Sequence, residues 1–227
     1  MRSYVIGDIH GCLDELRYLI EGLPLEVGDR LVFLGDYIDR GPNSSEVVSY
    51  LLDLKKYGPA LELVFLRGNH EDMLLSYLGL PGNHGDMFFY NGGKETLASY
   101  GLSSSDQTPH DALSMIPPAH LEFYQGLIDY YIMGDILCVH AGIDPLRDQF
   151  IYSPHSLLYT VLFGHTPQRE VYFHMPYKVG LDTGLVYGNK LSCLETEEKV
   201  LYQISRGKKK VHRIPIADKW NADTIPA

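Results

Sequence analysis

The sequence has few cysteines and contains no long apolar run. Its three cysteines, Cys12, Cys138 and Cys193, are far apart and show no CxxC spacing. They are too few to close a disulfide framework, so we expect buried free thiols in a reducing compartment. No stretch approaches the roughly 18 apolar residues that a transmembrane helix needs, and the first residues lack the apolar core of a signal peptide. We therefore expect a soluble, cytoplasmic protein with no membrane association.

Positive charge is also scarce. The 19 Lys and Arg residues are outnumbered by 29 Asp and Glu residues, which gives a formal net charge of −10. Such a chain lacks the broad basic face that binds duplex nucleic acid or an anionic membrane, so neither partner is expected. A phosphorylated substrate is still allowed, because metal ions can reverse the sign of the charge locally. The remaining composition, 45% hydrophobic and 21% charged over 227 residues, is typical of a globular protein with a full core.

The N-terminal part alternates apolar runs with helical patterns. Three short apolar runs predict strands at residues 3–6, 31–34 and 61–66. Leucines at helical spacing follow the first strand and stop at Pro24. A second helix is predicted through Lys56, with Asn43 at the N-cap three residues before Glu46.

The middle of the chain, residues 73–131, is richer in Tyr, Met and Pro and carries only short helical patterns. We interpret it as a helical insertion beside the N-terminal unit, with a Ser-rich exposed loop at 101–110. Further strands are predicted at 136–139, 161–163 and 179–181, and a terminal hairpin at 190–195 and 199–204. The basic run at 206–210 is interpreted as exposed surface. No repeat or long linker divides the chain, so a single domain over residues 1–227 is expected.

Polar clusters follow five of the apolar runs. They are GDIHG (7–11), GDYIDRG (35–41), GNHE (68–71), HAG (140–142) and GHT (164–166). In each cluster a strand stops and a side chain of a metal-ligand type follows, with glycine permitting a sharp turn. Ligands of open α/β sheets bind at the carboxyl ends of the strands, so these clusters are expected to converge in one crevice.

The donors in these clusters suit a centre of two metal ions. They are Asp8, His10, Asp36, Asn69, His140 and His165. This mixture of oxygen and imidazole donors suits Mn, Fe, Zn or Co better than Mg or Ca. A carboxylate can bridge two metals, and we expect Asp36 to be the bridge. Two metals roughly 3.5–4 Å apart activate water and stabilise an in-line displacement at phosphorus.

Taken in order, GDIHG, GDYIDRG, RGNHE, HAG and FGHT resemble the signature of the phosphoprotein phosphatase superfamily of calcineurin-like metallophosphoesterases. The resemblance extends from Gly7 to the DTGLVYG segment at 182–188. Five motifs in order are far more specific than any one of them. The resemblance implies an α/β fold in which two packed mixed sheets are flanked by helices, a four-layer metallophosphatase sandwich with a small helical insertion.

The resemblance also implies the cofactors. One metal would be held by Asp8, His10 and Asp36, and the second by Asp36, Asn69, His140 and His165. Two divalent ions are expected, with Mn ranked before Fe, Zn and Co. The nucleophile would be a hydroxide that bridges them, so no phosphoenzyme is expected.

Three further roles are carried over from the same motifs. His70 matches the general acid that protonates the leaving alkoxide. Asp39 matches the carboxylate that orients this imidazole and favours its protonated form. Arg40 matches a phosphate clamp, for which the forked donors of a guanidinium are well suited.

The implied function is metal-dependent hydrolysis of phosphomonoesters. A Ser/Thr protein phosphatase is the first interpretation, and a symmetrical diadenosine tetraphosphate hydrolase is the alternative. The substrate partner is accordingly a phosphorylated protein or a nucleotide polyphosphate. A third alternative is a non-catalytic binding protein with a decayed site, but the presence of every metal-ligand type argues against it.

The chain lacks one phosphate-binding element that is common in the family. Family members commonly carry a Leu-Trp-x-Arg element between the HAG and GH motifs, and its arginine grips the phosphate. No such element lies between His140 and His165. Arg147 or Arg169 replaces it, or the second clamp is absent. Loss of one charge-assisted contact costs about 1.5–3 kcal/mol.

Several residues near the motifs are left with two interpretations. Tyr187 either lines the site or packs, and Asp182 is a turn residue near the site. Cys12 begins a helix, which would lower its thiol pKa, although we interpret it as inert. Aromatic residues of the insertion either stack a base or pack, with packing favoured: Tyr77, Phe88, Phe89, Tyr90 and Tyr100.

Overall fold

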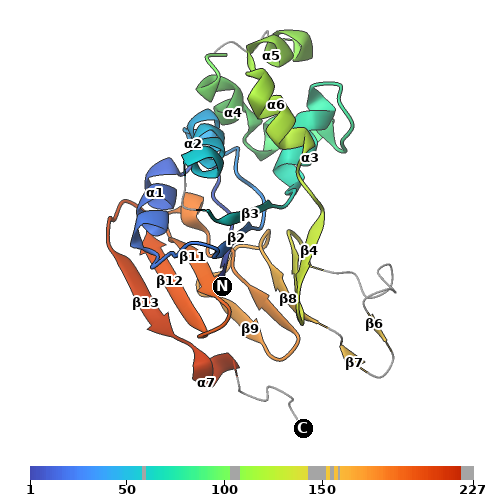
Figure 1. Ribbon diagram of the computed structural model, residues 1–227. Helices are drawn as coiled ribbons and strands as arrows, with labels where there is room; N and C mark the ends of the chain where they lie inside the picture. Colours follow the sequence, from blue (N-terminus) through green and yellow to red (C-terminus); the bar gives the residue numbers. More distant parts are fainter. Residues whose placement is uncertain (58–59, 103–107, 143–151, 154–155, 158, 221–227) are drawn as a thin grey trace.

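The computed structural model describes residues 1–57, 60–102, 108–142, 152–153, 156–157 and 159–220 (Figure 1). A six-stranded sheet has the order β13 (Val211–Pro215), β12 (Val200–Ser205), β11 (Lys190–Glu195), β1 (Ser3–Ile6), β2 (Arg30–Phe33) and β3 (Glu62–Phe65). A five-stranded sheet has the order β4 (Tyr130–Met133), β5 (Ile136–Val139), β8 (Thr160–Phe163), β10 (Lys178–Gly180) and β9 (Tyr172–His174). A separate pair consists of β6 (Tyr152–Ser153) and β7 (Ser156–Leu157).

Helices fill most connections of the first half of the chain. They are α1 (Leu13–Gly22), α2 (Ser44–Tyr57), α3 (Asn69–Tyr77), α4 (Gly93–Ser99), α5 (Pro109–Met115), α6 (Pro118–Gln125) and, near the C-terminus, α7 (Ala217–Trp220). Three 3₁₀ helices are η1 (Gly85–Met87), η2 (Phe89–Asn91) and η3 (Leu185–Tyr187). Figure 1 shows α3 to α6 gathered at one end of the sheets, and α1 and α2 beside the six-stranded sheet.

The parallel strands of the two sheets end at a common edge. β1, β2 and β3 are parallel neighbours in one sheet, and β5, β8 and β10 are parallel neighbours in the other. The loops that follow them touch across the sheets: the His140 ring after β5 lies 2.9 Å from the carbonyl oxygen of Leu34 after β2. The carboxyl ends of both parallel sets therefore face one region, as ligand sites in open α/β sheets require.

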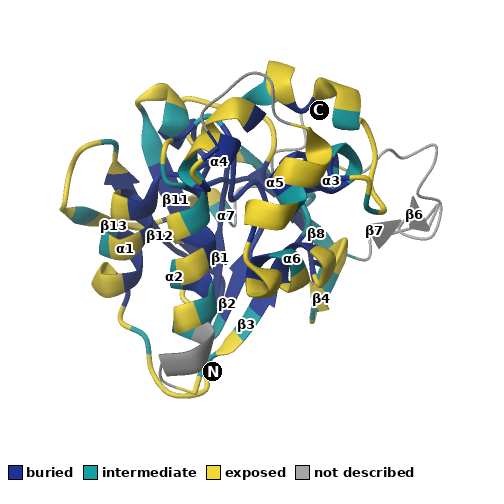
Figure 2. Ribbon diagram, turned by 90° about the horizontal axis from the view of Figure 1, so that it is seen from above, coloured by how far each residue is buried: buried dark blue, intermediate teal, exposed yellow. Residues whose placement is uncertain are grey.

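Each central strand contributes to two separate cores. Successive side chains of β1 alternate: Tyr4 and Ile6 lie in the core beneath the helices, and Val5 lies in the core between the two sheets. The second core continues with Val32 from β2 and Leu162 from β8. Burial on both faces explains why these strands read as continuous apolar runs rather than as alternating patterns. Figure 2 shows this central burial, with the exposed residues on the outer faces of the helices.

The predicted class, two packed mixed sheets flanked by helices, is confirmed. The first three strands, helix α1 and the terminal hairpin of β11 and β12 occur where the sequence predicts them. The sequence interpretation missed β4, β9 and β13, which lie at the edges of their sheets. These three strands are partly exposed, so they lack the buried apolar run that identifies a central strand.

The predicted loop at 101–110 is only partly observed. Residues 103–107 lie outside the described residues, and α5 already begins at Pro109. Thr108 caps this helix by accepting the Asp111 N–H, while the Asp111 carboxylate accepts the Thr108 N–H. This reciprocal capping box starts a helix inside the polar segment, which composition alone did not reveal.

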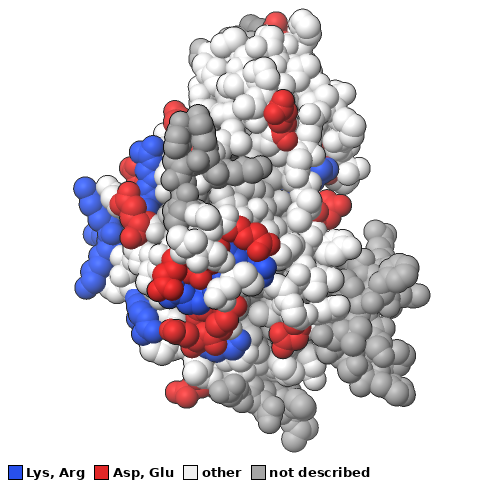
Figure 3. Space-filling model, in the orientation of Figure 1, with Lys and Arg blue, Asp and Glu red and all other residues white. Residues whose placement is uncertain are grey.

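Charges of both signs are mixed on the molecular surface. On the face drawn in Figure 3, Lys and Arg lie among Asp and Glu over the six-stranded sheet. The basic run after β12 is mostly exposed, and Arg206 forms a 2.8 Å ion pair with Glu15 of α1. None of the described helices has the length and apolarity needed to cross a lipid bilayer.

Candidate active site

The predicted site residues lie in five loops at the common edge of the sheets. Asp8 and His10 follow β1, Asp36, Asp39 and Arg40 follow β2, and Asn69 and His70 open α3 after β3. His140 follows β5, and His165 follows β8. The loops after β1 and β2 are joined through their backbones, because the Asp36 carbonyl oxygen accepts the N–H groups of Ile9 and His10. The edge of the sheets thus brings together residues that are up to 157 positions apart in sequence, as the 2.9 Å contact of His165 N with Asp8 Oδ2 shows.

Backbone strain is concentrated at these residues. Among the described residues, seven other than glycine have positive φ, and five of them are predicted site residues. Those five are His10, Asp36, Asp39, Arg40 and His165. Left-handed conformations are unfavourable for residues with a Cβ and persist where the surrounding structure enforces them, commonly at functional sites.

Two glycines are required by space beside the carboxylates. A Cβ at Gly68 would collide with Oδ1 of Asp36, and a Cβ at Gly164 would collide with Oδ1 of Asp8. The φ of Gly68 is −89°, a value open to any residue, so close approach rather than conformation requires glycine there. The glycines of the GNHE and GHT motifs therefore let the main chain come against the acidic side chains.

Three donors converge on one point beside Asp36. Oδ1 of Asn69 lies 3.0 Å from Nε2 of His140 and 2.8 Å from Nδ1 of His165, and these two nitrogens are 3.2 Å apart. The other ring nitrogen of His140 faces the Leu34 carbonyl oxygen, which fixes the orientation of the imidazole. Oδ1 of Asp36 completes the group at 3.3 Å from His140 Nε2. These donors fit a borderline divalent cation, and the carbonyl contact is the kind of support that metal-binding imidazoles receive.

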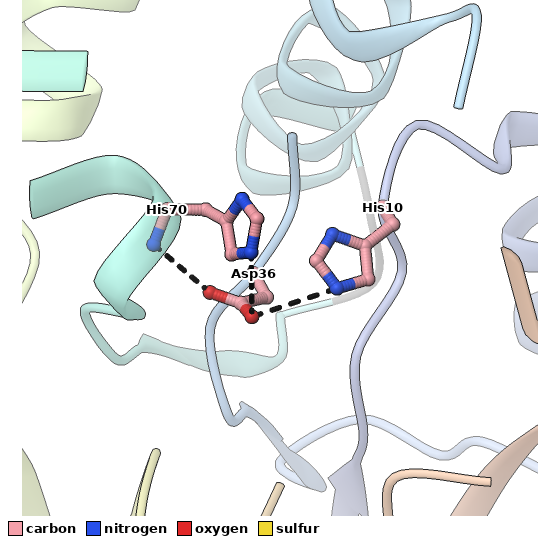
Figure 4. A group of neighbouring side chains, drawn as sticks. All are labelled: His10, Asp36 and His70. Carbon is pink, nitrogen blue, oxygen red and sulfur yellow. Dashed lines mark hydrogen bonds and ion pairs between the residues drawn. The ribbon is translucent and has the colours of Figure 1, made fainter. Parts of the chain in front are cut away.

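The second oxygen of Asp36 faces a different pair of imidazoles (Figure 4). Oδ2 lies 3.5 Å from Nε2 of His10 and 3.8 Å from Nε2 of His70. Nδ1 of His10 is 2.8 Å from the Ile38 carbonyl oxygen, so its Nε2 points toward Asp36. The two oxygens of Asp36 therefore address two separate donor groups, which is the arrangement of a bridging carboxylate.

The composition of this second group differs from the expected one. In the described residues, the metal-sized clusters are His10, Asp36 and His70, and Asp36, His140 and His165. Asp8 does not join His10 and Asp36 in a cluster of this size. Its carboxylate instead accepts the backbone N–H of His165, at 3.2 and 2.9 Å from its two oxygens. Asp8 thus lies at the site, bound to the loop after β8, while His70 occupies the position beside His10.

The site concentrates buried negative charge. Burial raises the pKa of Asp8 well above its ordinary value, and the neighbouring Asp182 carboxylate adds to the effect. Burial likewise raises the pKa of Asp182. Burial opposes the charged form of His140 as well, but Asp36 and Asp8 outweigh it and raise the pKa of His140 to about 10. Such a surplus of buried carboxylates is what a bound cation would stabilise, so the charges as well as the donors fit divalent metal ions.

His70 and Asp39 form a closed pair. Nδ1 of His70 lies 2.6 Å from Oδ2 of Asp39, and the other oxygen of Asp39 accepts the Thr96 hydroxyl at 2.5 Å. Burial raises the pKa of Asp39 and lowers the pKa of His70 to about 4. Burial thus opposes the charged form of each group, while the 2.6 Å contact between them favours a shared proton. The expectation that Asp39 favours the protonated imidazole stays a prediction.

Arg40 lies between the donors and the surface. Its Nη1 is 2.7 Å from Nε2 of His10, the nitrogen that a metal would use. A cation on His10 therefore requires this guanidinium to move off the nitrogen. Burial lowers the pKa of His10 to about 3, so its Nε2 accepts the hydrogen bond from Arg40.

Glu71 is a structural anchor of the site that the sequence analysis left without a role. Its fully buried carboxylate accepts backbone N–H groups of Asp36 and Gly68, both at 3.0 Å, and of Tyr37 at 2.8 Å. It thereby ties the loop after β2 to the start of α3. The signal was its place directly after His70 in GNHE, where an acidic residue in a first helical turn has an ordinary explanation.

Two hollows are lined by residues of the predicted site. One of about 540 Å³ is lined by Arg67, Asn69 and His140, among others. The other, of about 450 Å³, is lined by Arg40, Tyr90, Asn91, Gly92, Glu95 and Tyr187. The first hollow thus reaches the donors Asn69 and His140, and the second lies beside Arg40, which contacts His10.

The structure bears on which arginine replaces the missing second phosphate clamp. Arg147 lies outside the described residues, and Arg169 is exposed, with its carbonyl oxygen accepting a hydrogen bond from Asn189. Arg67, which the sequence analysis did not weigh, lines the larger hollow. Its guanidinium is already partly engaged, since Nη2 donates to the Leu127 carbonyl oxygen at 3.2 Å.

The residues with two interpretations are now separated. Cys12 is buried, and burial raises the pKa of its thiol to about 12, which favours the interpretation as an inert residue. Phe88 and Tyr100 are buried packing residues. Tyr90 and Tyr187, by contrast, are 86% and 62% exposed.

Comparisons with known proteins place this geometry in a family. Two relatives are named bis(5'-nucleosyl)-tetraphosphatase PrpE, asymmetrical. The one from Bacillus thuringiensis (strain Al Hakam) is 27% identical in an alignment 238 positions long, gaps included, that spans 87% of this chain and 92% of the relative. The one from Bacillus subtilis (strain 168) is 27% identical in an alignment 237 positions long that spans 83% of this chain and 88% of the relative.

Solved structures share the fold. A structure described as a "putative diadenosine tetraphosphatase" aligns with a TM-score of 0.64 at 22% identity, covering 90% of this chain and 93% of its own. The cold-active protein-tyrosine phosphatase of Shewanella sp. aligns with a TM-score of 0.61 at 16% identity, covering 93% and 80%. A family model described as Calcineurin-like phosphoesterase matches residues 1–199. The chain therefore belongs to the calcineurin-like phosphoesterase family and is a metallophosphoesterase, a hydrolase of phosphoric esters.

Proposed function

We propose that this metallophosphoesterase cleaves a dinucleoside polyphosphate at two divalent cations. The observation that carries the proposal is the convergence of donors around Asp36, whose two oxygens face His140 on one side and His10 on the other. Asn69 and His165 would complete the first cation site. His10, with Asp8 or His70, would complete the second. When bound, the cations would act as Lewis acids on the phosphate and on the attacking water.

The side chains around the cations have separate tasks in this proposal. Arg40, released from His10, would grip non-bridging phosphate oxygens with its forked donors. His70 would give a proton from Nε2 to the leaving oxygen. Asp39, which contacts Nδ1 of the same ring, would orient the imidazole for this step. Thr96 would hold Asp39 in place through its 2.5 Å hydrogen bond. Manganese is our first choice of metal, because the mixture of imidazole, amide and carboxylate donors suits it.

The choice of substrate reverses the ranking that the sequence suggested. Relatives that align over most of this chain carry the name asymmetrical bis(5'-nucleosyl)-tetraphosphatase. The two hollows, one lined by Asn69 and His140 and the other by Arg40, offer room for the two ends of a long polyphosphate substrate. We therefore propose asymmetrical cleavage, which gives a mononucleotide and a nucleoside triphosphate, in place of the symmetrical cleavage that the sequence suggested.

A Ser/Thr protein phosphatase is the second candidate. One observation favours it, namely the His70 and Asp39 pair. The alkoxide of a phosphoserine is a poor leaving group that needs a proton, whereas a nucleoside triphosphate can leave without one. A general acid built this closely is therefore of more use to a phosphomonoesterase.

A direct comparison of substrates tests the proposal. The Mn²⁺-loaded protein is given diadenosine tetraphosphate and a phosphothreonine peptide in parallel, and the products are separated by anion-exchange chromatography. We expect AMP and ATP in equal amounts, with kcat/KM at least tenfold above that for the peptide. Two molecules of ADP would show symmetrical cleavage, and a preference for the peptide would establish the second candidate. Activity on neither substrate, unchanged in His70→Asn, would indicate a non-catalytic protein.

A further inference from the structure

Two tyrosines stand out on the surface beside the site. Tyr90 is 86% exposed, more than any other large hydrophobic residue that the structure describes, and Tyr187 is 62% exposed. They come from η2 and η3, which are about a hundred residues apart in sequence, yet both line the hollow that begins at Arg40. Neither ring is required for packing at this level of exposure.

Tyr90 is held beside Arg40 by the backbone. Gly92, two residues after Tyr90, accepts the Arg40 N–H through its carbonyl oxygen at 3.2 Å. The φ of Gly92 is +97°, and a Cβ there would lie 2.7 Å from the Arg40 nitrogen. The turn that carries Tyr90 is therefore fixed directly against the phosphate-clamp loop.

Tyr187 is held in place by the turn of η3. The turn of η3 lies between two left-handed glycines, Gly184 and Gly188, and Leu185 anchors it in the core. Asp182 accepts the Gly184 N–H at 2.9 Å, which joins the turn to the acidic end of the site. The Arg40 guanidinium lies 5.6 Å from the centre of the Tyr187 ring, a cation–π contact.

The charges of this hollow disfavour a second phosphate. Arg40 is the cation of its lining, and the Glu95 carboxylate lies in the same lining. An anion placed beyond Arg40 would meet Glu95, whereas a neutral planar group would meet two aromatic rings and the amide of Asn91. The hollow is thus suited to an aromatic group attached to the phosphate that Arg40 grips.

We propose that Tyr90 and Tyr187 form a stacking subsite for the nucleobase bonded through ribose to the reacting phosphate. This inference rests on the proposed function with water attacking the α-phosphorus and the nucleoside triphosphate leaving, because the α-phosphorus carries the 5′-oxygen. The base then lies one ribose away from Arg40, where the two rings are. Stacking on an aromatic side chain tolerates any base, so the subsite selects nucleotides as a class.

Two matched ligands test the subsite. AMP and ribose 5-phosphate carry the same phosphate and sugar and differ only in the base. We expect the Mn²⁺-loaded protein to bind AMP about tenfold more tightly than ribose 5-phosphate by titration calorimetry, and Tyr90→Ala and Tyr187→Ala each to remove most of this advantage. Tyr90→Phe and Tyr187→Phe should keep it, because phenylalanine stacks as well. Tyr172→Ala, at an exposed tyrosine of edge strand β9, serves as the control.

Each outcome has a defined meaning. Equal affinity for AMP and ribose 5-phosphate in the wild type, or an advantage that survives both alanine variants, would overturn the subsite. A greater advantage for phenyl phosphate than for AMP would replace the nucleobase by a phosphotyrosine side chain. Hydrolysis of diadenosine tetraphosphate without an AMP advantage would remove the subsite and leave the proposed function. Tighter binding of AMP without hydrolysis of diadenosine tetraphosphate would support the subsite and contradict the proposed function.

Discussion

His70 meets two carboxylates with two different nitrogens. Nδ1 is 2.6 Å from Asp39, and Nε2 is 3.8 Å from Asp36 at the donor cluster. The ring can therefore serve as a proton donor to a leaving group or as a ligand in place of Asp8. The two roles predict different responses to the same substitution, because only a proton donor is sensitive to the basicity of the leaving group.

We expect His70→Asn to lower kcat on phenyl phosphate about 10²- to 10⁴-fold and to affect 2,4-dinitrophenyl phosphate much less. Phenolate needs a proton as it leaves, whereas dinitrophenolate does not. The rates are measured on Mn²⁺-loaded protein, with bound manganese determined by mass spectrometry. Equal losses on both substrates together with a lower manganese content would assign His70 to the metal instead.

At this scale the sequence predicted the residues better than their contacts. Asp36, Asn69, His140 and His165 could be named because each ends an apolar run in a recognisable motif, and they do converge. That His70 rather than Asp8 groups with His10 and Asp36 could not be foreseen, because it depends on how the loops after the strands aim their side chains, and these loops include left-handed turns. Five such turns lie at the site, and no local pattern specifies left-handed conformation for residues other than glycine.

At the scale of the structural elements, the loops that follow β2 and β3 can pack together only because their backbones approach closely at Gly68. Gly68→Ala should lower thermal stability and weaken manganese binding, because its new Cβ would collide with Oδ1 and the backbone nitrogen of Asp36. Gly142→Ala is the matched control, since a Cβ there meets nothing within 4 Å. Melting temperature and manganese affinity by calorimetry are measured for both variants. If the two variants behaved alike, the packing of Gly68 against Asp36 would have no consequence for the site.

The helices packed over α2 share a buried polar cluster. Nδ1 of His120 in α6 is 2.8 Å from the Tyr100 hydroxyl, and its Nε2 is 3.2 Å from the Ser49 hydroxyl of α2. Tyr100 in turn is 2.8 Å from the Tyr124 hydroxyl. The sequence alone does not indicate this cluster, because the partners of His120 come from distant segments. Its contacts now join three helical segments.

This cluster should make stability depend on pH. Burial lowers the pKa of His120, so the folded state binds fewer protons at this group than the unfolded state, whose value is about 6.5. The contribution to the free energy of unfolding is complete above pH 6.5 and is lost as the pH falls below that value. Urea unfolding of wild type and His120→Gln at pH 8 and pH 5 measures it. The wild type should lose more stability than the variant, and parallel losses would contradict the assignment.

Among the strands, the edge strands β4 and β13 could not be predicted from the sequence. β1 and β2 were identifiable because both of their faces are buried, so nearly every side chain is apolar. β13 is largely exposed and β4 is half exposed, and their residues do not form a buried run. They are strands because β12 and β5 offer free hydrogen-bonding edges. Such pairing is decided by tertiary structure, so single-sequence patterns do not report it.

For the molecule as a whole, the donor cluster lies on the seam between the two sheets. Asp36 and Asn69 extend from the six-stranded sheet, and His140 and His165 extend from the five-stranded sheet. An apolar core lies between the sheets, and hydrogen bonds such as that from the His165 N–H to Asp8 join their loops. A cation bound by all four residues would therefore cross-link the sheets, and its binding free energy would add to the stability of the fold.

We expect Mn²⁺ to raise the melting temperature of the protein and EDTA to reverse the effect. At a free concentration about 100 times the Kd, one such site contributes about 2.7 kcal/mol to the free energy of unfolding. His165→Ala should lose most of this response, because it removes a largely exposed ligand at little cost to the core. Arg169→Ala, at an exposed residue of the same loop, should keep it. A melting temperature that does not change with Mn²⁺ in the wild type would mean that no cation joins the two sheets. A response retained in His165→Ala would show that Asp36, Asn69 and His140 hold the cation without His165.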